Sequence, residues 1–307
     1  MTPHPPDHCR GMQPDQRGAM ARHSAITAAA QKWVGLVPFL AFTGLFLIAP
    51  TLFIVIGAFR TPAGGFTVQN ILDLNTPSIL SAYWVSIKVS FLSALLGCLI
   101  GFAMAAAMTL GGISNRVKSP LMTFSGVASN FAGVPLAFAF IATIGPAGLI
   151  TMYLRTEWGI NLRVYGWNLL STWGLIITYL FFQIPLMILI ITPALEGLKK
   201  EWREAADILG ATRLQYWRMV AMPILFPSIL GTMALLFANS FGAVATAIAL
   251  TGSSLNIVPI LLFAQIRGDV LGDPHLGYAL AFGMIVVTGI ANTIYIVLRA
   301  RSERWQK

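Results

Sequence analysis

The chain has 307 residues, of which 56% are hydrophobic and only 10% are charged, and its mean hydropathy is +0.74. A water-soluble domain carries about 25% charged residues, so this composition excludes an ordinary soluble protein and indicates a chain that folds in lipid. The formal net charge of +9 does not predict a nucleic-acid partner, because the basic residues flank apolar segments instead of forming one polar face.

The N-terminal segment, residues 1–32, is rich in Pro, Gly and Gln, which predicts a disordered cytoplasmic tail. It holds a group of potential metal ligands: His4, His8, Cys9 and His23. In a segment of this composition we expect a tail and no metal site. The second cysteine, Cys98, lies in an apolar segment, so a structural disulfide with Cys9 is not expected.

Six segments reach the length of about 20 apolar residues that a membrane-spanning helix needs. In chain order they are Val34–Phe59, Tyr83–Leu110, Pro120–Ile144, Leu170–Leu195, Pro223–Leu250 and Gly277–Leu298. The first exceeds the apolar core of a signal peptide, which has about 7–15 residues, and we expect it to stay as an anchor. The predicted fold class is therefore all-α, a polytopic bundle of six transmembrane helices.

The positions of the Lys and Arg residues predict the orientation, because cytoplasmic loops carry an excess of them. With both termini in the cytoplasm, most of the 20 basic residues lie inside, and only Arg60, Arg155, Arg163 and Arg267 lie outside. An odd number of spans would place the basic C-terminus outside. The segments Arg60–Ile79, Gly145–Trp167 and Thr251–Leu276 are then the outer loops.

The predicted spans contain no Asp or Glu, and their only ionisable residue with a charge at neutral pH is Lys88. Its position near the outer end allows the side chain to reach the interface, although a role towards a substrate is the alternative. Carriers driven by protons or sodium usually have carboxylates or unwound ion sites inside the membrane. This composition therefore disfavours a secondary carrier.

Uncharged polar side chains do occur within the spans, at Asn130, Gln183, Asn239, Ser240 and Asn292. Pro135 and Pro185 would interrupt helical hydrogen bonding at mid-depth, and freed carbonyls in lipid need a partner or a water-lined cavity. One interpretation is hydrogen bonding between helices. The other is a polar translocation pathway, with Asn130, Gln183, Asn239 and Phe241 as the residues that would line it.

A polar loop, residues 196–223, separates the fourth and fifth predicted spans. Its apolar residues Leu198, Trp202, Ala205 and Leu209 recur at helical spacing. Gly210 is expected to end this first short helix, and Thr212 with Gln215 forms a capping box that begins a second one. Pro223 is expected in the first turn of the next span.

The two tryptophans of the polar loop, Trp202 and Trp217, are typical anchors of a protein contact. A helix lying on the lipid surface is one alternative. A DNA-binding helix-turn-helix has a similar outline. We disfavour that last alternative because predicted membrane spans flank the loop closely on both sides.

The polar loop resembles the EAA loop of bacterial ABC-importer permeases. That pattern is Glu-Ala-Ala, three residues, Gly, nine residues, Ile, one residue, Leu-Pro. Here it reads Glu204-Ala205-Ala206, Gly210, Val220 and Met222-Pro223 at the same spacing, with Val for Ile and Met for Leu. The resemblance extends over roughly Tyr83 to Leu298.

The resemblance implies a type I ABC importer permease in a bacterial inner membrane, with residues 33–81 as the first helix and periplasmic loop, 82–298 as the core permease domain and 299–307 as a basic cytoplasmic tail. The implied partners are a cytoplasmic ATPase dimer, a second permease subunit that is often a paralogue, a periplasmic substrate-binding protein and membrane lipid. The residues implied to couple to the ATPase are Trp202, Glu204, Ala205, Ala206, Gly210 and Pro223.

The chain has no G-x-x-x-x-G-K-[ST] loop, so we expect no cofactor and no enzymatic activity of its own, with ATP bound by the partner ATPase. The layout most resembles spermidine/putrescine permeases and their sulfate, iron and phosphonate relatives. A polyamine is therefore the first expectation for the cargo, with a sulfate-like anion, ferric iron or a phosphonate as alternatives. A stand-alone channel or secondary carrier is the competing class.

Overall fold

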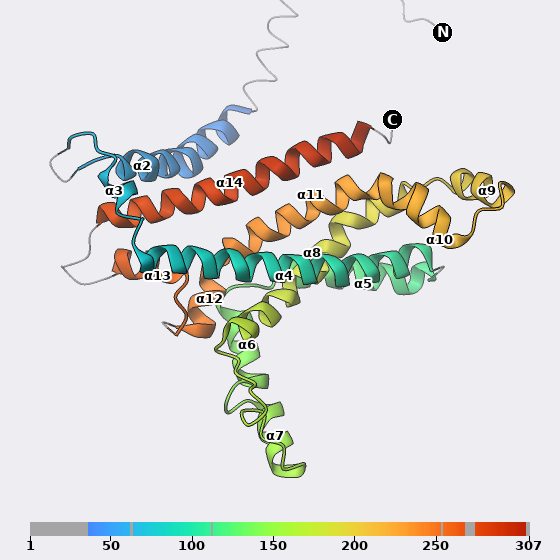
Figure 1. Cartoon of the computed structure of the whole chain (residues 1–307), viewed down its shortest axis with the longest axis horizontal. Coiled ribbons are helices and arrows are strands. Elements are labelled where there is room, and N and C mark those ends of the chain that lie inside the picture. Colours follow the sequence, from blue (N-terminus) through green and yellow to red (C-terminus); the bar gives the residue numbers. More distant parts are fainter. Residues whose placement is uncertain (1–35, 62–63, 112, 253, 268–273, 305–307) are drawn as a thin grey trace, which may run out of the picture. The chain divides into compact units, whose positions relative to one another are not determined.

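The computed structural model describes residues 36–61, 64–111, 113–252, 254–267 and 274–304 (Figure 1). These residues are helical apart from their connections and one isolated bridge between Arg60 and Phe66. Among them are six helices long and apolar enough to cross a membrane: Leu36–Ala58, Pro77–Leu110, Val134–Glu157, Thr172–Glu196, Arg213–Phe241 and His275–Ala300. The predicted all-α fold with six spans is confirmed, and the tail predicted for residues 1–32 lies outside the described residues.

The chain divides into two compact units, Met1–Gly57 and Ala58–Lys307. The first candidate span contains a π-helical turn, η2 (Gly44–Ile48), followed by α2 (Ala49–Ala58). Pro50 follows this turn closely, and a proline can neither donate a backbone hydrogen bond nor fit against the carbonyl four residues before it. The wider turn gives the helix room for the proline.

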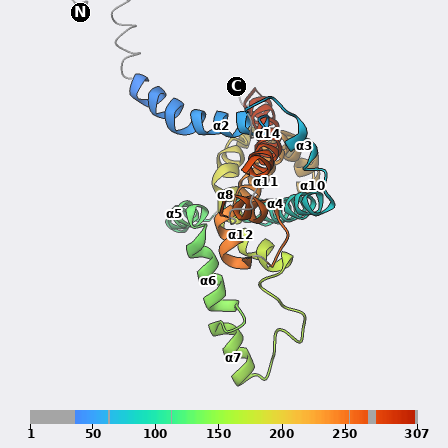
Figure 2. The ribbon, with the colours of Figure 1, turned by 90° about the vertical axis from the view of Figure 1, so that its left-hand side faces the viewer.

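Four helices of the second unit lie side by side and form its bundle (Figures 1 and 2). They are α4 (Pro77–Leu110), α8 (Thr172–Glu196), α11 (Met222–Phe241) and α14 (Pro274–Arg304). The longest, α4, begins where the Thr76 side chain accepts a hydrogen bond from the amide of Ile79. One buried apolar cluster joins α4, α8 and α11, and a second joins α4, α8, α6 and α12.

Two glycines of α4 bring it close to α8. A Cβ atom on Gly97 would lie 2.8 Å from the Cβ of Gln183, and one on Gly101 would lie 2.6 Å from the Cβ of Met187. Glycines four residues apart lie on one helix face, and in a membrane such faces allow backbones to approach closely. The Gly97–Gly101 pair therefore sets the α4–α8 distance.

The third predicted span, Pro120–Ile144, is wrong as a single helix. The chain forms α5 (Asn115–Asn130), breaks at Phe131–Gly133, and continues as α6 (Val134–Ile144) in a different direction (Figure 1). Gly133 has φ of +77°, which only glycine adopts readily, and Pro135 lies in the first turn of α6 instead of interrupting a helix. A further helix, α7 (Leu149–Glu157), lies within the predicted outer loop Gly145–Trp167.

The fifth predicted span, Pro223–Leu250, is also broken. Helix α11 ends at Phe241, and α12 (Val244–Thr251) begins after Gly242 and Ala243. Helix α13 (Val258–Arg267) then lies in the predicted outer loop, and α3 (Gln69–Leu72) lies in the first one. At the other end, α14 continues to Arg304, so residues 299–304 of the predicted basic tail extend the last helix.

Candidate functional site

The polar loop folds as two short helices around a sharp turn. The first, α9, runs from Lys200 to Ile208, and Gly210 follows it with φ of +73°. The amide of Ala211 donates to the Ala206 carbonyl at 2.9 Å, and the amide of Gly210 donates to the Asp207 carbonyl at 3.0 Å. These two bonds form the Schellman motif, in which a left-handed residue closes the helix.

The second helix, α10 (Arg213–Tyr216), begins with the predicted capping box. The Thr212 amide donates to Gln215 Oε1 at 2.7 Å, and the Gln215 amide donates to Thr212 Oγ1 at 3.3 Å. Both local predictions for the polar loop, the glycine turn and the capping box, are therefore confirmed.

Pro223 lies in the first turn of α11, as predicted. The helix is continuous from Arg213 to Phe241, and a π-helical turn, η3 (Trp217–Ala221), lies immediately before Pro223. The wider turn before α11 accommodates the missing N–H group of this proline, so α10, η3 and α11 follow one another without a break. The polar loop and α11 are one continuous helical rod beyond residue 213.

The tip of the polar loop exposes large apolar side chains to the surroundings. Ile208 is 86% exposed, Leu209 84%, Leu214 77% and Met219 72%. Leu198 and Trp217, by contrast, pack against the buried cluster of α4, α8 and α11 and hold the loop to the bundle. An exposed apolar tip on an otherwise charged segment is typical of a surface that another protein covers.

The residues predicted to couple to an ATPase lie on this loop with different exposure. Glu204, Ala205 and Gly210 are exposed, Trp202 and Ala206 are partly buried, and Pro223 is exposed at the start of α11. The Lys199 ammonium lies 5.9 Å from the centre of the Trp202 ring. Their role in coupling stays a prediction.

An ion pair connects the base of the polar loop to α5. Lys118 Nζ lies 2.5 Å from Glu196 Oε1. The contact joins residues 78 positions apart, so it fixes the end of α8 to the beginning of α5. The Lys118 side chain is 20% exposed and the Glu196 side chain 52% exposed, so water screens the pair from the Glu196 side.

A second polar feature lies inside the bundle, which we call the polar centre (Ser93, Gln183 and Ser240). Gln183 Nε2 donates to Ser93 Oγ at 2.9 Å, and the hydroxyls of Ser93 and Ser240 are 2.8 Å apart. All three side chains are buried, and Gln183 Oε1 has no hydrogen-bond partner. Each of the helices α4, α8 and α11 contributes one residue, so the polar centre connects these three helices by hydrogen bonds.

The two helix breaks meet beside the polar centre. The amide of Gly133 donates to Thr246 Oγ1 at 2.7 Å, and the Tyr179 hydroxyl donates to the Ala243 carbonyl at 3.1 Å. Irregular backbone at membrane depth persists only where protein buries it or where it lines a water-filled cavity. At both breaks the structure shows protein hydrogen bonds that satisfy backbone groups, from Gly133 to Thr246 and from Tyr179 to Ala243.

The four residues predicted to line a pathway fall into two groups. Asn130 and Asn239 are exposed, each near a helix break, whereas Gln183 and Phe241 are buried inside the chain's own core. Sequence reasoning missed three other hydrogen-bonding groups of this region: Ser93, Tyr179 and Thr246. Hydroxyls inside apolar spans were their only signal. No group of three or more His, Cys, Asp and Glu residues able to hold a metal occurs in the part of the chain that the structure describes.

Comparison with known proteins gives a family match. The family model described as "Binding-protein-dependent transport system inner membrane component" matches residues 97–307. The sulfate transport system permease protein CysT of Salmonella typhimurium is 27% identical over 199 residues, which cover 63% of this chain and 68% of that protein. The molybdenum transport system permease protein ModB of Mycobacterium tuberculosis is 25% identical over 222 residues, covering 71% and 78%.

Solved structures show the same fold. A chain of a bacterial ABC transporter involved in the import of the acidic polysaccharide alginate superposes with a TM-score of 0.68 at 16% identity, covering 94% of this chain and 100% of that one. The relatives above are named for sulfate and molybdenum. They do not support the first expectation from sequence, a resemblance to polyamine permeases.

Proposed function

Because the chain belongs to the family of inner membrane components of binding-protein-dependent transport systems, we propose that it is the permease subunit of an ATP-driven importer of a sulfate-like oxyanion. A member of this family is a multi-pass transport component and not itself an enzyme. The observation that carries the proposal is the polar loop, which joins the family motif to an exposed apolar tip.

We expect the tip to bind a cytoplasmic ATPase. Its four exposed apolar side chains lie on or beside α9 and α10, and the Schellman turn and capping box give these helices a defined shape. A preformed apolar surface binds a partner without the entropic cost of ordering a flexible loop. The expected assembly also contains a second permease and a binding protein on the outer side.

The continuous helix Arg213–Phe241 gives the loop a direct mechanical connection to the bundle interior. Its 29 residues span about 43 Å at 1.5 Å per residue. One end adjoins the docking tip, and the other carries Ser240 of the polar centre. A rigid-body displacement of the tip by closing ATPases would therefore move Ser240 relative to Ser93 and Gln183, and switch the bundle between two packings.

A sulfate-like oxyanion fits the polar groups better than a polyamine does. The predicted spans carry no carboxylate, which a binding site for a polycation would be expected to contain. Amides, hydroxyls and backbone amides near the helix breaks are hydrogen-bond donors suited to an oxyanion. The sulfate and molybdenum permeases among the relatives support the same chemical class.

Transport by the reconstituted complex tests the proposal. Vesicles containing this chain, its partner ATPase, the second permease and the cognate binding protein should take up radiolabelled sulfate or molybdate only when ATP is present. Putrescine and ferric iron serve as cargo controls. Uptake of putrescine alone would overturn the oxyanion assignment, and sulfate uptake without ATP or the ATPase would overturn the import-permease assignment itself.

A further inference from the structure

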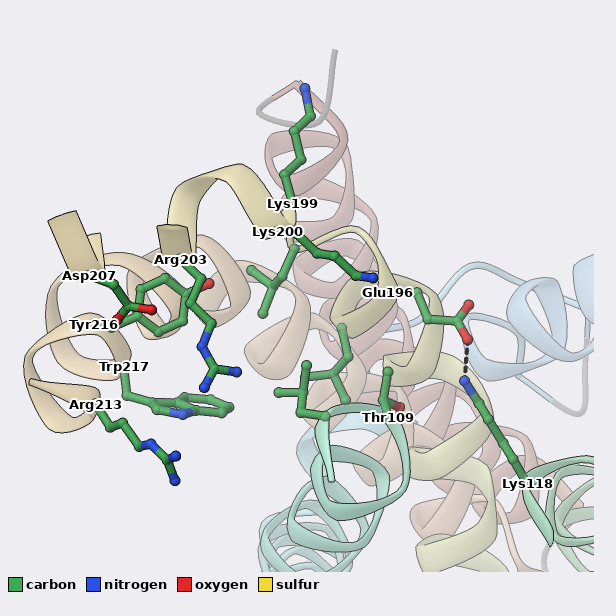
Figure 3. A pocket seen from close by; sticks show the side chains of 13 residues that line it. Thr109, Lys118, Glu196, Lys199, Lys200, Arg203, Asp207, Arg213, Tyr216 and Trp217 are labelled. Atoms are coloured by element: carbon green, nitrogen blue, oxygen red, sulfur yellow. Dashed lines mark hydrogen bonds and ion pairs between the residues drawn. The ribbon is translucent and has the colours of Figure 1, made fainter. Parts of the chain in front are cut away.

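A cavity of about 510 Å³ lies between the polar loop and the ends of α4, α5 and α8 (Figure 3). This volume falls in the range of small-molecule sites in proteins, about 300–1,000 Å³. It lies on the bundle side of α9 and α10, where Leu198 and Trp217 pack, whereas the exposed tip carries Ile208 and Leu209. The cavity and the docking tip are therefore separate features of one loop.

The cavity wall is positively charged. Five basic residues line it, together with Glu196 and Asp207, and Lys118 already neutralises Glu196 through their ion pair. Figure 3 shows Arg203 extending from α9 toward the space beside Trp217 and Lys200 extending toward the side of Glu196, whereas Lys199 points away from both. Asp207 is the only other carboxylate in the wall, so the remaining charge favours an anion.

The wall is also partly apolar, because Leu110, Leu195 and the Trp217 ring contribute to it. With the polar loop on the cytoplasmic side, the ends of α4 and α8 place this cavity at the headgroup level of the inner leaflet. Tryptophan is enriched at that level, and basic pockets between transmembrane helices on the cytoplasmic side suit anionic headgroups. A cationic wall beside an apolar one matches a ligand that carries both a phosphate and hydrocarbon.

We propose that this cavity binds a phosphate group, supplied by an anionic phospholipid of the inner leaflet, with Lys200 and Arg203 holding the phosphate and Leu110 and the Trp217 ring contacting the hydrocarbon. The ligand then connects the polar loop to the bundle at the point where the loop must transmit motion. Soluble phosphate shares the same recognition chemistry, and the experiment separates the two sources. The proposal does not depend on which cargo is transported.

Native mass spectrometry of the full-length chain in detergent tests the proposal. Phosphatidylglycerol and phosphatidylcholine of equal chain length are added separately, and inorganic phosphate is added in a third series. The wild-type chain should retain phosphatidylglycerol in preference to phosphatidylcholine, and Lys200→Gln/Arg203→Gln should weaken its retention by about tenfold or more. The charge-preserving Lys200→Arg/Arg203→Lys variant should keep most of it.

The matched control is Arg155→Gln/Arg163→Gln, which removes two exposed cations outside the cavity wall and should leave lipid retention unchanged. Phosphate adducts that need Lys200 and Arg203, without preference between the lipids, would support the anion site and assign soluble phosphate as its source. Equal retention of every ligand by wild type and Lys200→Gln/Arg203→Gln would overturn the proposal. The proposal would also be overturned if Lys200→Gln/Arg203→Gln retained lipid as the wild type does but no longer co-purified with the ATPase. The cavity would then belong to the interface between the two proteins.

Discussion

Gly97 of α4 faces Gln183 of α8 so closely that a methyl group on the glycine would lie 2.8 Å from the glutamine Cβ. The same contact brings the Gln183 amide within 2.9 Å of the Ser93 hydroxyl, one turn earlier on α4. A small residue and a polar residue thus act together, because the close approach of the backbones lets the polar centre form.

We expect Gly97→Ala to destabilise the bundle by about 1–3 kcal/mol, since overpacking forces α4 and α8 apart. Thermal unfolding of the purified chain in detergent measures the change. Gly126→Ala on α5 is the matched control, because nothing lies within 4 Å of its added Cβ, and it should be neutral or slightly stabilising. Equal melting temperatures for Gly97→Ala and wild type would contradict the packing.

We expect Gly210→Val to leave the chain in the membrane but abolish ATP-dependent uptake. Gly210 has φ of +73° with open space around its Cα, so the strain comes from the backbone alone and not from a clash. A non-glycine residue in this conformation costs about 1–2 kcal/mol, and asparagine tolerates it best. Gly210→Asn should therefore retain much of the uptake, and equal loss in both variants would show that the turn conformation is not what matters.

The exposed tip should be needed for contact with the ATPase. Leu209→Asp places a charge on a side chain that is 84% exposed, and we expect the ATPase to co-purify poorly with this variant. Val164→Asp is the control, because Val164 is 78% exposed but follows α7 in a predicted outer loop. Normal co-purification with Leu209→Asp would place the docking surface elsewhere.

Substitutions in the polar centre should separate stability from transport. Ser93→Ala removes the hydrogen-bond acceptor of Gln183 Nε2, and Gln183 Oε1 already has no partner, so both side-chain polar atoms of Gln183 are then unsatisfied. We expect the free energy of unfolding to fall by about 1–3 kcal/mol. Gln183→Leu removes the buried amide altogether and should be close to neutral for stability, yet uptake should fall because the switchable contact is lost. Wild-type uptake by Gln183→Leu would remove the polar centre from the transport cycle.

The predicted orientation can be checked with single cysteines at Gly64 and Lys200 in a background without Cys9 and Cys98. An impermeant thiol reagent applied from outside should label the first position and not the second, because the basic residues place the polar loop in the cytoplasm. Labelling of both positions in intact cells would refute the six-span orientation.

Local chemistry made the polar loop predictable from sequence. The hydrogen bonds around Gly210 and between Thr212 and Gln215 join residues only a few positions apart in the sequence. Their spacing alone therefore indicates the turn and the helix cap. The family motif indicated which class of membrane protein to expect. The number of membrane spans was also predictable from hydropathy, because a span is recognised by the length of one continuous apolar segment.

Long-range contacts were not predictable in this way. The run Pro120–Ile144 is apolar throughout, and hydropathy does not show that the backbone changes direction at Gly133. Ser93 and Ser240 are 147 residues apart, and Lys118 and Glu196 are 78 apart, so no local pattern links them. The expectation of a polyamine cargo came from the general layout of the chain, which carries no chemical information about a cargo, and the sulfate and molybdenum relatives do not support it.

The apolar tip of the polar loop has a consequence for the lifetime of this chain in the cell. A subunit without its ATPase presents Ile208, Leu209, Leu214 and Met219 to water, as a misfolded protein presents its core. Quality-control proteases act on such surfaces, so the surplus of unassembled subunit should be degraded faster than the assembled fraction. Pulse-chase labelling with and without co-expressed ATPase would show a longer half-life in its presence, and Leu209→Asp would lengthen the half-life of the subunit made alone. The supply of the partner would then set how much of this membrane protein the cell keeps.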